Sequence, residues 1–440
     1  MPLILGANSV SGYTVKNSLR FNSGSSDYLN RTLGTPTSRR IWTTSFWVKR
    51  SQLSTEQYMF LNAYNDGTNR QTNFTFTNDA LELQLVTGGA YSGRIITNAL
   101  YRDISAWYHV ILAIDTTQAT DTNRIKLYVN GSQVTSFSTA TYPAQNFDTS
   151  LANTRVLYIG ATSTPTASFN GYLSEYYFID GQQLTPSSFG ETDTASGIWI
   201  PKAYSGSHGT NGFYLKFANS ASLGTDSSGN GNTWTVNNLT SIDQTTDTPT
   251  NNFATFNALF PSSATLTEGN LACTTNTDGN MTGGTFGASS GKWYAEIKYT
   301  GSGTPSLGIA SVGLKAELGS TSDSYGYMSS AQKYNNGSMT SYGSSYTTND
   351  IIGIALDLDN GTLIFYKNGV SQGTAFTSIS GTFTFGGSRT TATQTSFTAN
   401  FGNPPYSANS YTDGAGYGNF SYAVPSGYYA LNTKNLANFG

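Results

Sequence analysis

The sequence has little charge, almost no cysteine and no long apolar run. Of its 440 residues only 11% are charged, against roughly a quarter in ordinary soluble domains. The single cysteine, Cys273, excludes a disulfide framework within the chain. No stretch reaches the ~20 apolar residues that a membrane-spanning helix needs. A disulfide-rich scaffold and a helical membrane protein are therefore not expected.

The charges that are present carry no strong excess of one sign. The formal net charge is −3, which predicts no basic patch and argues against nucleic acid or an anionic membrane as a partner. The opening residues, MPLILGANSV, lack the positive region of a secretory signal peptide. Together with the single cysteine, this favours a protein that is assembled in a reducing cytoplasm and displayed outside it.

Helical patterns are nearly absent, whereas short aromatic and β-branched runs between turn residues are frequent. The 29 Tyr and 24 Phe argue against disorder, and 47 Gly punctuate the chain. One short helical turn is expected where Thr185 can cap and Pro186 can occupy the first helical position. The sequence therefore predicts an all-β protein.

Two nearly identical stretches predict hairpins. KLYVNGSQV at 126–134 and IFYKNGVSQ at 364–372 each place Asn-Gly between runs that favour strands. Asn-Gly accepts positive φ at both central positions of a type I′ turn, whose twist suits antiparallel strands. Because the surrounding residues differ, the similarity of the two stretches indicates two β domains and not a true repeat.

The first block of strands carries a family resemblance. LRFNSGSSDYLNRT, TTSFWVKR, WYHVILAIDTT with RIKLYVNGSQV, and LYIGATS with FNGYLSEYYFIDGQQLT follow one another over about 170 residues. In this order they resemble the laminin-G/concanavalin-A-like lectin sandwich. Within TTSFWVK, Phe46 and Val48 should face one way, and Ser45, Trp47 and Lys49 the other. The resemblance implies two curved antiparallel sheets in a jelly roll, with ligands held on loops or on the concave face.

The second block resembles a different recognition module. GKWYAEIKYTG, NDIIGIALDLDNGTLIFYKNGVSQGTAF and FTANFGNPPYS come in the order of a SPRY (B30.2) domain. This resemblance implies a second β-sandwich that recognises a partner and catalyses nothing. We expect an N-terminal arm over 1–16, the lectin-like sandwich over 17–197, an ordered bridge with aromatic anchors over 198–262, and the SPRY-like sandwich with its C-terminal tail over 263–440.

The arrangement as a whole resembles virion proteins of tailed marine bacteriophages. FGETDTASGIWIPKAY, GTDSSGNGNTW and DTPTNNFATFN contribute to this resemblance, which covers nearly the whole chain. It implies a structural protein of the phage particle, without placing it on a tail fibre, another appendage or the capsid.

Candidate catalytic groups are few. A retaining glycosidase needs two carboxyl groups about 5 Å apart. Glu175 and Asp180 should point to opposite faces of a regular strand, and Asp357 and Asp359 match a structural turn of the SPRY domain. His109 matches a structural strand position, while His208 and Cys273 have no placed partners for nucleophilic catalysis. We therefore predict no enzyme, with glycan hydrolysis as a minor alternative.

Metal binding is left open by the sequence. Asp27, Asp115, Asp121, Asp226 and Asn230 can supply oxygen ligands for a structural Ca²⁺. The same residues fit Asx turns, which we favour, so no ligand is assigned and no cofactor is expected.

Carbohydrate binding is the most specific activity that the composition supports, since aromatic rings stack on sugars while amides and hydroxyls bind their OH groups. The best candidate surface is SYGYMSSAQKYNNGSMTSYGSSYTTND. Tyr325 and Tyr342 match SPRY positions that pack, so Tyr334 and Tyr346 are the candidate glycan-binding residues.

These observations predict a non-enzymatic virion protein with recognition modules for host-surface glycan. Its expected partners are other virion proteins and copies of itself, because edge strands of either sandwich can pair. A capsid decoration protein without a ligand is the alternative. The host, the sugar and the oligomeric state are not determined by the sequence.

Overall fold

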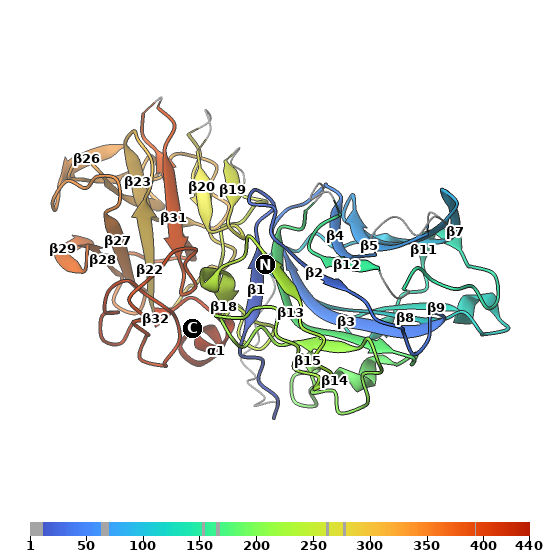
Figure 1. Cartoon of the computed structure of the whole chain (residues 1–440). Helices are drawn as coiled ribbons and strands as arrows, with labels where there is room; N and C mark the ends of the chain where they lie inside the picture. The colour runs from blue at the N-terminus through green and yellow to red at the C-terminus, as the bar shows by residue number, and fades with distance from the viewer. Residues whose placement is uncertain are drawn as a thin grey trace. The chain divides into compact units, whose positions relative to one another are not determined.

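The computed structural model describes residues 12–62, 70–151, 155–163, 168–260, 264–275, 279–391 and 393–440. Ser9–Thr250 form one compact unit and Asn251–Gly440 belong to another. Each unit is built on two β-sheets (Figure 1), so the predicted all-β fold with tandem sandwiches is confirmed. Residues 1–11 of the expected N-terminal arm lie outside the described residues. None of the described helices has the length and apolar character to cross a bilayer.

The first unit contains two large sheets. One is ordered β10-β9-β8-β3-β13-β1-β18, and β16 also pairs with β13. The other is ordered β11-β7-β6-β5-β4-β12-β2-β17. The bounds of its strands and short helices are β1 (Ser18–Phe21), β2 (Tyr28–Thr32), β3 (Ile41–Arg50), β4 (Gln57–Asn62), β5 (Gln71–Thr77), β6 (Ala80–Thr87), β7 (Ala90–Leu100), β8 (Trp107–Asp115), η1 (Asp121–Asn123), β9 (Ile125–Val129), β10 (Ser132–Gln133), β11 (Phe137–Thr141), β12 (Val156–Ile159), β13 (Gly171–Asp180), η2 (Pro186–Ser188), β14 (Gly190–Thr192), β15 (Trp199–Pro201), β16 (Phe213–Leu215), β17 (Thr235–Asn237), η3 (Ser241–Asp243) and β18 (Gln244–Thr245).

Alternation along β3 places one face of that strand in the core between the sheets. Phe46 and Val48 are fully buried there, and the Phe46 ring stacks on Tyr176 of β13 at a centroid distance of 4.8 Å. Trp47 and Lys49 take the other face, as the alternation predicts, but they too are buried. The sheet face that carries Trp47 and Lys49 must therefore be covered by another part of the chain.

The cover comes from residues 185–250. In this stretch β14 pairs with β15, β16 with β13, β17 with β2, and β18 with β1. The segment that was expected to bridge two domains from 198 onward thus completes the first unit as far as Thr250. Its aromatic side chains explain this, because Trp199, Phe213, Tyr214, Phe217 and Trp234 pack onto the first unit's strands and could not stay in water as a linker.

The second unit has one sheet ordered β19-β20-β31-β22-β27-β28-β29, with β32 beside β22, and another ordered β21-β30-β23-β24-β25-β26. Its elements are β19 (Thr265–Thr267), β20 (Ala272–Thr274), β21 (Thr282–Gly283), β22 (Lys292–Tyr299), β23 (Pro305–Ser311), β24 (Ser324–Met328), β25 (Gln332–Asn335), β26 (Ser338–Ser341), β27 (Ile351–Asp357), β28 (Thr362–Lys367), β29 (Val370–Phe376), β30 (Phe383–Arg389), β31 (Ser396–Asn400), β32 (Tyr429–Ala430) and the helix α1 (Thr433–Phe439). Alternate residues of β22, β27 and β28 form its core, among them Trp293, Ile354 and Phe365.

Glu296 attaches the C-terminal tail to this sandwich. It is fully buried on β22, and its carboxylate accepts hydrogen bonds from Ser421 N and Tyr422 N, both at 2.9 Å, and from Asn400 Nδ2 at 3.0 Å. A carboxylate can be buried at tolerable cost only when several donors meet it. The tail is therefore an integral part of the second unit.

The two Asn-Gly hairpins are confirmed. Asn130 and Gly131 have φ of 48° and 80°, and Asn368 and Gly369 have 50° and 79°. Each asparagine also accepts a backbone N–H from the neighbouring strand, Asn130 from His109 at 2.8 Å and Asn368 from Ile351 at 2.9 Å. The repeated residues thus fix both the turn and its attachment to the next strand.

An aromatic ring from a later segment covers each hairpin. A Cβ on Gly131 would lie 2.5 Å from the Trp199 ring, and a Cβ on Gly369 would lie 2.7 Å from the Tyr422 ring. Glycine is therefore needed at both positions for two reasons, the positive φ and the close ring. This second reason was not predicted by the sequence.

The predicted helical turn near Pro186 is present as η2, but Thr185 makes no capping bond. Its hydroxyl pairs instead with Ser187 Oγ at 3.0 Å. The helix α1 was not predicted; Asn432 caps it by accepting from Asn435 N.

Candidate functional site

The two tyrosines predicted to bind glycan are buried. Tyr334 is 8% and Tyr346 2% exposed, whereas Tyr325 and Tyr342, which were expected to pack, are half-buried. Tyr346 donates its hydroxyl to the Tyr327 carbonyl at 2.8 Å, and burial raises its pKa well above the ordinary value. The expected order of exposure is wrong, because the 342–350 loop folds over the sandwich and carries Tyr346 inward. A sugar could stack on the Tyr346 ring only if this loop opened, whereas Tyr334 lies on β25 with its ring against Gly319.

His109 is held as a structural group. Its ring stacks on Trp47 at 4.7 Å, Nδ1 lies 2.8 Å from Trp199 Nε1, and Nε2 lies 2.8 Å from Ser45 Oγ. Because an indole N–H can only donate, Nδ1 is the acceptor and Nε2 carries the proton. Burial lowers the pKa of His109 to about 3. The imidazole is therefore neutral at pH 7, with both nitrogens engaged.

The other candidate nucleophile and base are also packed into the fold. His208 is half-buried, with its ring parallel to Tyr177 at 6.3 Å, and burial lowers its pKa. Cys273 is buried, and burial raises the pKa of its thiol to about 12. This thiol stays protonated at neutral pH, so it lacks the thiolate character of a reactive cysteine.

Glu175 and Asp180 bind separate sets of donors. Glu175, with φ of 49°, lies where a bulge shifts the register of β13 against β3. Its carboxylate accepts from the hydroxyls of Tyr13, Tyr177 and Tyr214 at 2.5, 3.0 and 2.8 Å. The regular alternation that was assumed for this strand is therefore interrupted, because a bulge inserts an extra residue.

The Asp180 carboxylate instead fixes a loop. It accepts Thr37 N at 2.6 Å, Ser38 N at 3.1 Å and Asn211 N at 3.0 Å. In the second unit, Asp359 accepts Gly291 N at 2.8 Å, and Asp357 pairs with Lys292 at 2.9 Å. Each of these acids has a structural set of partners.

Of the five residues named as possible Ca²⁺ ligands, Asp115 and Asp226 form the Asx-type turns that the sequence favoured. Asp115 accepts Thr117 N at 3.0 Å, and Asp226 accepts Ser228 N at 2.9 Å. Asp27 accepts Asn22 N, Asp121 accepts Thr122 N, and Asn230 donates through Nδ2 to the carbonyl of Gly212. Among the described ranges, no group of three or more His, Cys, Asp or Glu side chains converges as a metal site.

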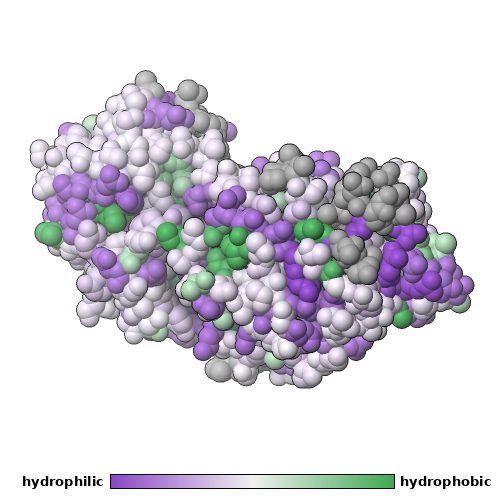
Figure 2. Space-filling model, in the orientation of Figure 1, coloured by the Kyte–Doolittle hydropathy of each residue, from purple (hydrophilic) through white to green (hydrophobic). Residues whose placement is uncertain are grey.

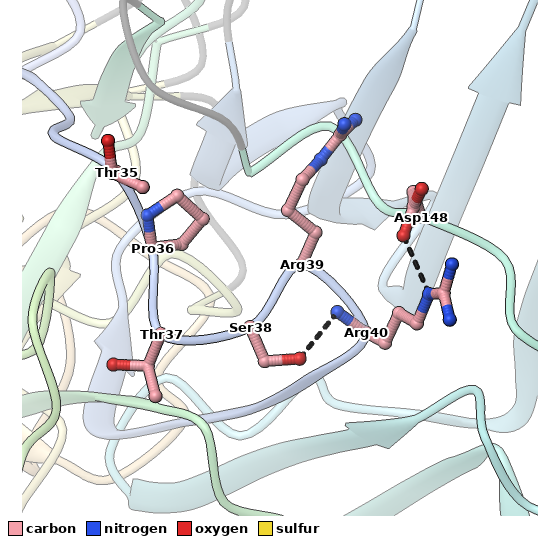
Figure 3. A pocket seen from close by; sticks show the side chains of 7 residues that line it. All are labelled: Thr35, Pro36, Thr37, Ser38, Arg39, Arg40 and Asp148. Atoms are coloured by element: carbon pink, nitrogen blue, oxygen red, sulfur yellow. Dashed lines mark hydrogen bonds and ion pairs between the residues drawn. The ribbon is translucent and has the colours of Figure 1, made fainter.

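A hollow of about 370 Å³ lies at one rim of the first unit, between the loop joining β2 to β3 and the segment that precedes β12. Its lining residues are Thr35, Pro36, Thr37, Ser38, Arg39, Arg40 and Asp148 (Figure 3). Arg40 Nε lies 2.7 Å from Asp148 Oδ1 in an ion pair at the surface. Arg40 N donates to Ser38 Oγ at 3.1 Å, and both interactions are drawn in Figure 3.

The loop that lines this hollow is held on both sides. Asp180 binds its backbone at Thr37 and Ser38. Arg39 donates through Nη2 to the Thr149 carbonyl at 3.0 Å, and Thr149 Oγ1 returns a bond to the Arg39 carbonyl at 2.6 Å. The hollow is thus largely preformed, a property of binding sites for small ligands.

Arginines gather around the hollow. Arg39 and Arg40 line it, and Arg155 donates to the carbonyl of Arg70 at 3.1 Å. Burial is the main cause that lowers the pKa of Arg39, with Asp148 acting in the opposite direction and Arg70 and Arg40 lowering it further. The hydrogen bond from Arg40 holds the pKa of Asp148 below its ordinary value. Only one lining residue, Asp148, is acidic.

Two arginines and one acid line this hollow, a local arrangement that the net charge of −3 did not indicate. Net charge is a sum over the chain and carries no information on where the charges lie. The Arg39-Arg40 doublet, in a chain with 11% charged residues, is the signal that could have located the cluster.

Most of the large apolar side chains that are exposed are isolated from one another on the surface. In Figure 2, hydrophilic and intermediate residues occupy most of the face shown, and hydrophobic residues appear in small groups. Exposed examples include Ile198 and Leu259 at 60% and Val370 at 65%. Isolated apolar residues are ordinary on protein surfaces and mark no site by themselves.

Two protein families match the chain. Residues 23–188 match the model of the concanavalin A-like lectin/glucanases superfamily, and residues 292–403 match the model of the SPRY domain. The ATP-dependent RNA helicase DDX1 of Xenopus laevis is 33% identical over 92 residues, which are 21% of this chain and 12% of the helicase. The E3 ubiquitin-protein ligase RKP of Arabidopsis thaliana is 36% identical over 93 residues, 20% of this chain and 7% of the ligase. The chain thus spans only a small part of these relatives.

Solved structures match parts of the chain. The SPRY domain of human HERC1 is 21% identical, covering 33% of this chain and 96% of that one, with a TM-score of 0.30. The heptameric SAP-like pentraxin from Limulus polyphemus is 18% identical, covering 39% of this chain and 80% of that one, with a TM-score of 0.31. On the strength of the family matches, the chain carries a laminin G-type, concanavalin A-like domain followed by a SPRY domain.

Proposed function

We propose that this chain is a non-enzymatic structural protein of a tailed bacteriophage particle, and that its lectin-like unit binds glycan on the host surface. The two domain types suggest recognition of carbohydrate or protein.

The observation that carries glycan binding is the preformed hollow at Thr35–Arg40. It combines the exposed residues Thr35 and Thr37, the ring of Pro36 and the guanidinium of Arg40. A sugar presents hydroxyls, which need such donors and acceptors, and apolar C–H faces, which need a surface like the proline ring. The hollow lies within the range of about 300–1,000 Å³ that is typical of small-molecule sites.

The virion role is supported by the resemblance to marine phage proteins. Its segments FGETDTASGIWIPKAY and GTDSSGNGNTW lie in the layer that completes the first unit. We propose that the protein is assembled in the host cytoplasm and displayed outside the cell, with other virion proteins and copies of itself as partners. A non-enzymatic role is supported by the engagement of Glu175, Asp180 and His109 in structural hydrogen bonds.

A glycan array probed with the purified full chain tests the proposal. We expect binding to a restricted set of host-surface glycans, lost when the Thr35–Arg40 loop is altered. Failure to bind any glycan, together with tight association with capsids, would favour the decoration protein instead. Release of cleaved oligosaccharide from host envelope material would contradict the non-enzymatic part.

A further inference from the structure

The guanidinium of Arg40 is placed to meet an anionic ligand. The Arg40 side chain is 42% exposed and the Asp148 side chain 35%. Within the described residues, the only hydrogen bond of the Arg40 guanidinium goes from Nε to Asp148. Four of its five N–H groups are therefore available, and their planar fork matches a carboxylate or sulfate.

The surroundings add positive charge. Arg39 contributes a second guanidinium to the lining, and its pKa is affected by both Arg40 and Arg70. Arg155, 4% exposed, is electrostatically coupled to Arg39 as well. Two arginines, Arg39 and Arg40, thus line a hollow whose lining contains one acid, Asp148. In a protein with a net charge of −3, this is a local excess of cations.

We infer that the hollow binds acidic saccharides, with a uronate carboxylate or a sulfate ester of the glycan on Arg40. This inference rests on the proposed glycan binding and specifies its ligand class. The neighbouring hydroxyls complete the site: Ser38 Oγ already accepts Arg40 N and Ile41 N at 3.1 Å each, so its own proton can be donated to a sugar oxygen.

Asp148 selects against denser polyanions. Duplex DNA carries one charge about every 1.7 Å along its axis, so successive phosphates would be forced against the Asp148 carboxylate. A glycan with a single uronate or sulfate on a sugar ring has hydroxyls on the rest of that ring, and these can accept or donate near Asp148. The mixed lining therefore fits an acidic glycan better than a nucleic acid.

Two pairs of substitutions in the first unit test the inference. Arg40→Gln removes the proposed contact, and Lys202→Gln removes an equal charge from another exposed ion pair, Lys202–Glu191, whose ions lie 3.8 Å apart. Asp148→Asn removes the competing carboxylate, and Glu191→Gln is its matched control. Binding of the full chain to a uronate polymer, a sulfated polymer, a neutral polymer and duplex DNA is measured by titration calorimetry at fixed salt.

Arg40→Gln should weaken binding of a uronate or sulfated polymer by about tenfold or more, as expected for a hydrogen bond to a charged group, while Lys202→Gln changes it less than twofold. Asp148→Asn should tighten binding, and Glu191→Gln should not. Comparison of the uronate polymer with the sulfated polymer identifies which anion the hollow binds. Equal effects of Arg40→Gln and Lys202→Gln, or DNA bound as tightly as the acidic glycans, would overturn the inference.

The outcome separates the inference from the proposed function. If the chain binds only neutral glycans, glycan recognition stands and the acidic ligand class is wrong. If no polymer or array glycan binds at all, the proposed function itself fails.

Discussion

Replacing Gly131 with alanine tests whether the ring of Trp199 fixes the first Asn-Gly hairpin. Gly131 has φ of 80°, and an added Cβ would approach Trp199 Cε3 to 2.5 Å and Cζ3 to 2.7 Å. Gly89, at the tip between β6 and β7, also has φ of 80° but has no atom within 4 Å of its Cβ position. Gly89→Ala is therefore a matched control that carries the backbone strain alone.

The expected magnitudes follow from two separate costs. An L-residue in the left-handed region costs about 1–2 kcal/mol, which is the expected loss in the free energy of unfolding for Gly89→Ala. Overpacking adds about 1–3 kcal/mol, so Gly131→Ala should lose about 2–5 kcal/mol in total. The Trp199 ring cannot move freely, because its Nε1 donates to His109 and its other side packs on Gly190.

Urea unfolding followed by tryptophan fluorescence measures this difference. Five of the six tryptophans, at positions 42, 47, 107, 199 and 234, lie in the first unit, so the signal reports mainly on that unit. The same contrast can be repeated in the second unit with Gly369→Ala, whose Cβ would meet the Tyr422 ring, and Gly373→Ala, whose Cβ would meet nothing. Equal losses for Gly131→Ala and Gly89→Ala would refute the role given to Trp199.

Three further perturbations address buried polar groups. His109 has a folded-state pKa of about 3 against an ordinary value near 6.5. Between these values the unfolded state binds the extra proton, so each unit by which the pH is lowered reduces the free energy of unfolding by about 1.4 kcal/mol. His109→Gln, which can still donate and accept, should remove about 2 kcal/mol of the loss between pH 6.5 and 5; unchanged pH dependence in denaturant titrations would contradict this. Glu296→Gln places an amide NH₂ among donors and should destabilise the second unit by about 1–3 kcal/mol, measured by thermal unfolding, whereas a neutral result would mean that the tail is held by other contacts. Lys49→Met leaves the buried carboxylate of Asp247 without the ammonium that lies 2.8 Å away and should cost about 3–5 kcal/mol, which Lys49→Met combined with Asp247→Asn should largely recover; no recovery would refute the pairing.

Local features of the sequence predicted local structure well. Asn-Gly specified both hairpins, because its tolerance of positive φ is a property of the residues themselves. Alternation in TTSFWVK assigned Phe46 and Val48 to one face of β3 and Lys49 to the other. What alternation could not show was that residues 185–250 fold over the second face and bury it, since that cover comes from a distant part of the chain.

The candidate site could not be predicted in the same way. Tyr346 was expected to be more exposed than Tyr325 and Tyr342, which match SPRY positions that pack, yet it is 2% exposed because its loop folds inward. Arg40 and Asp148 are more than a hundred residues apart and form their ion pair only in the folded unit. The net charge of the chain could not show that Arg39 and Arg40 line one hollow with a single acid.

The sequence by itself determined the strands, the turns and the two domain types, because these depend on side-chain periodicity and on the φ preferences of neighbouring residues. Tertiary structure alone decided which rings became exposed, which acids were engaged and where arginines gathered. Those properties depend on contacts between residues far apart in the chain, which packing of the sheets and their covering layer brings within a few ångströms.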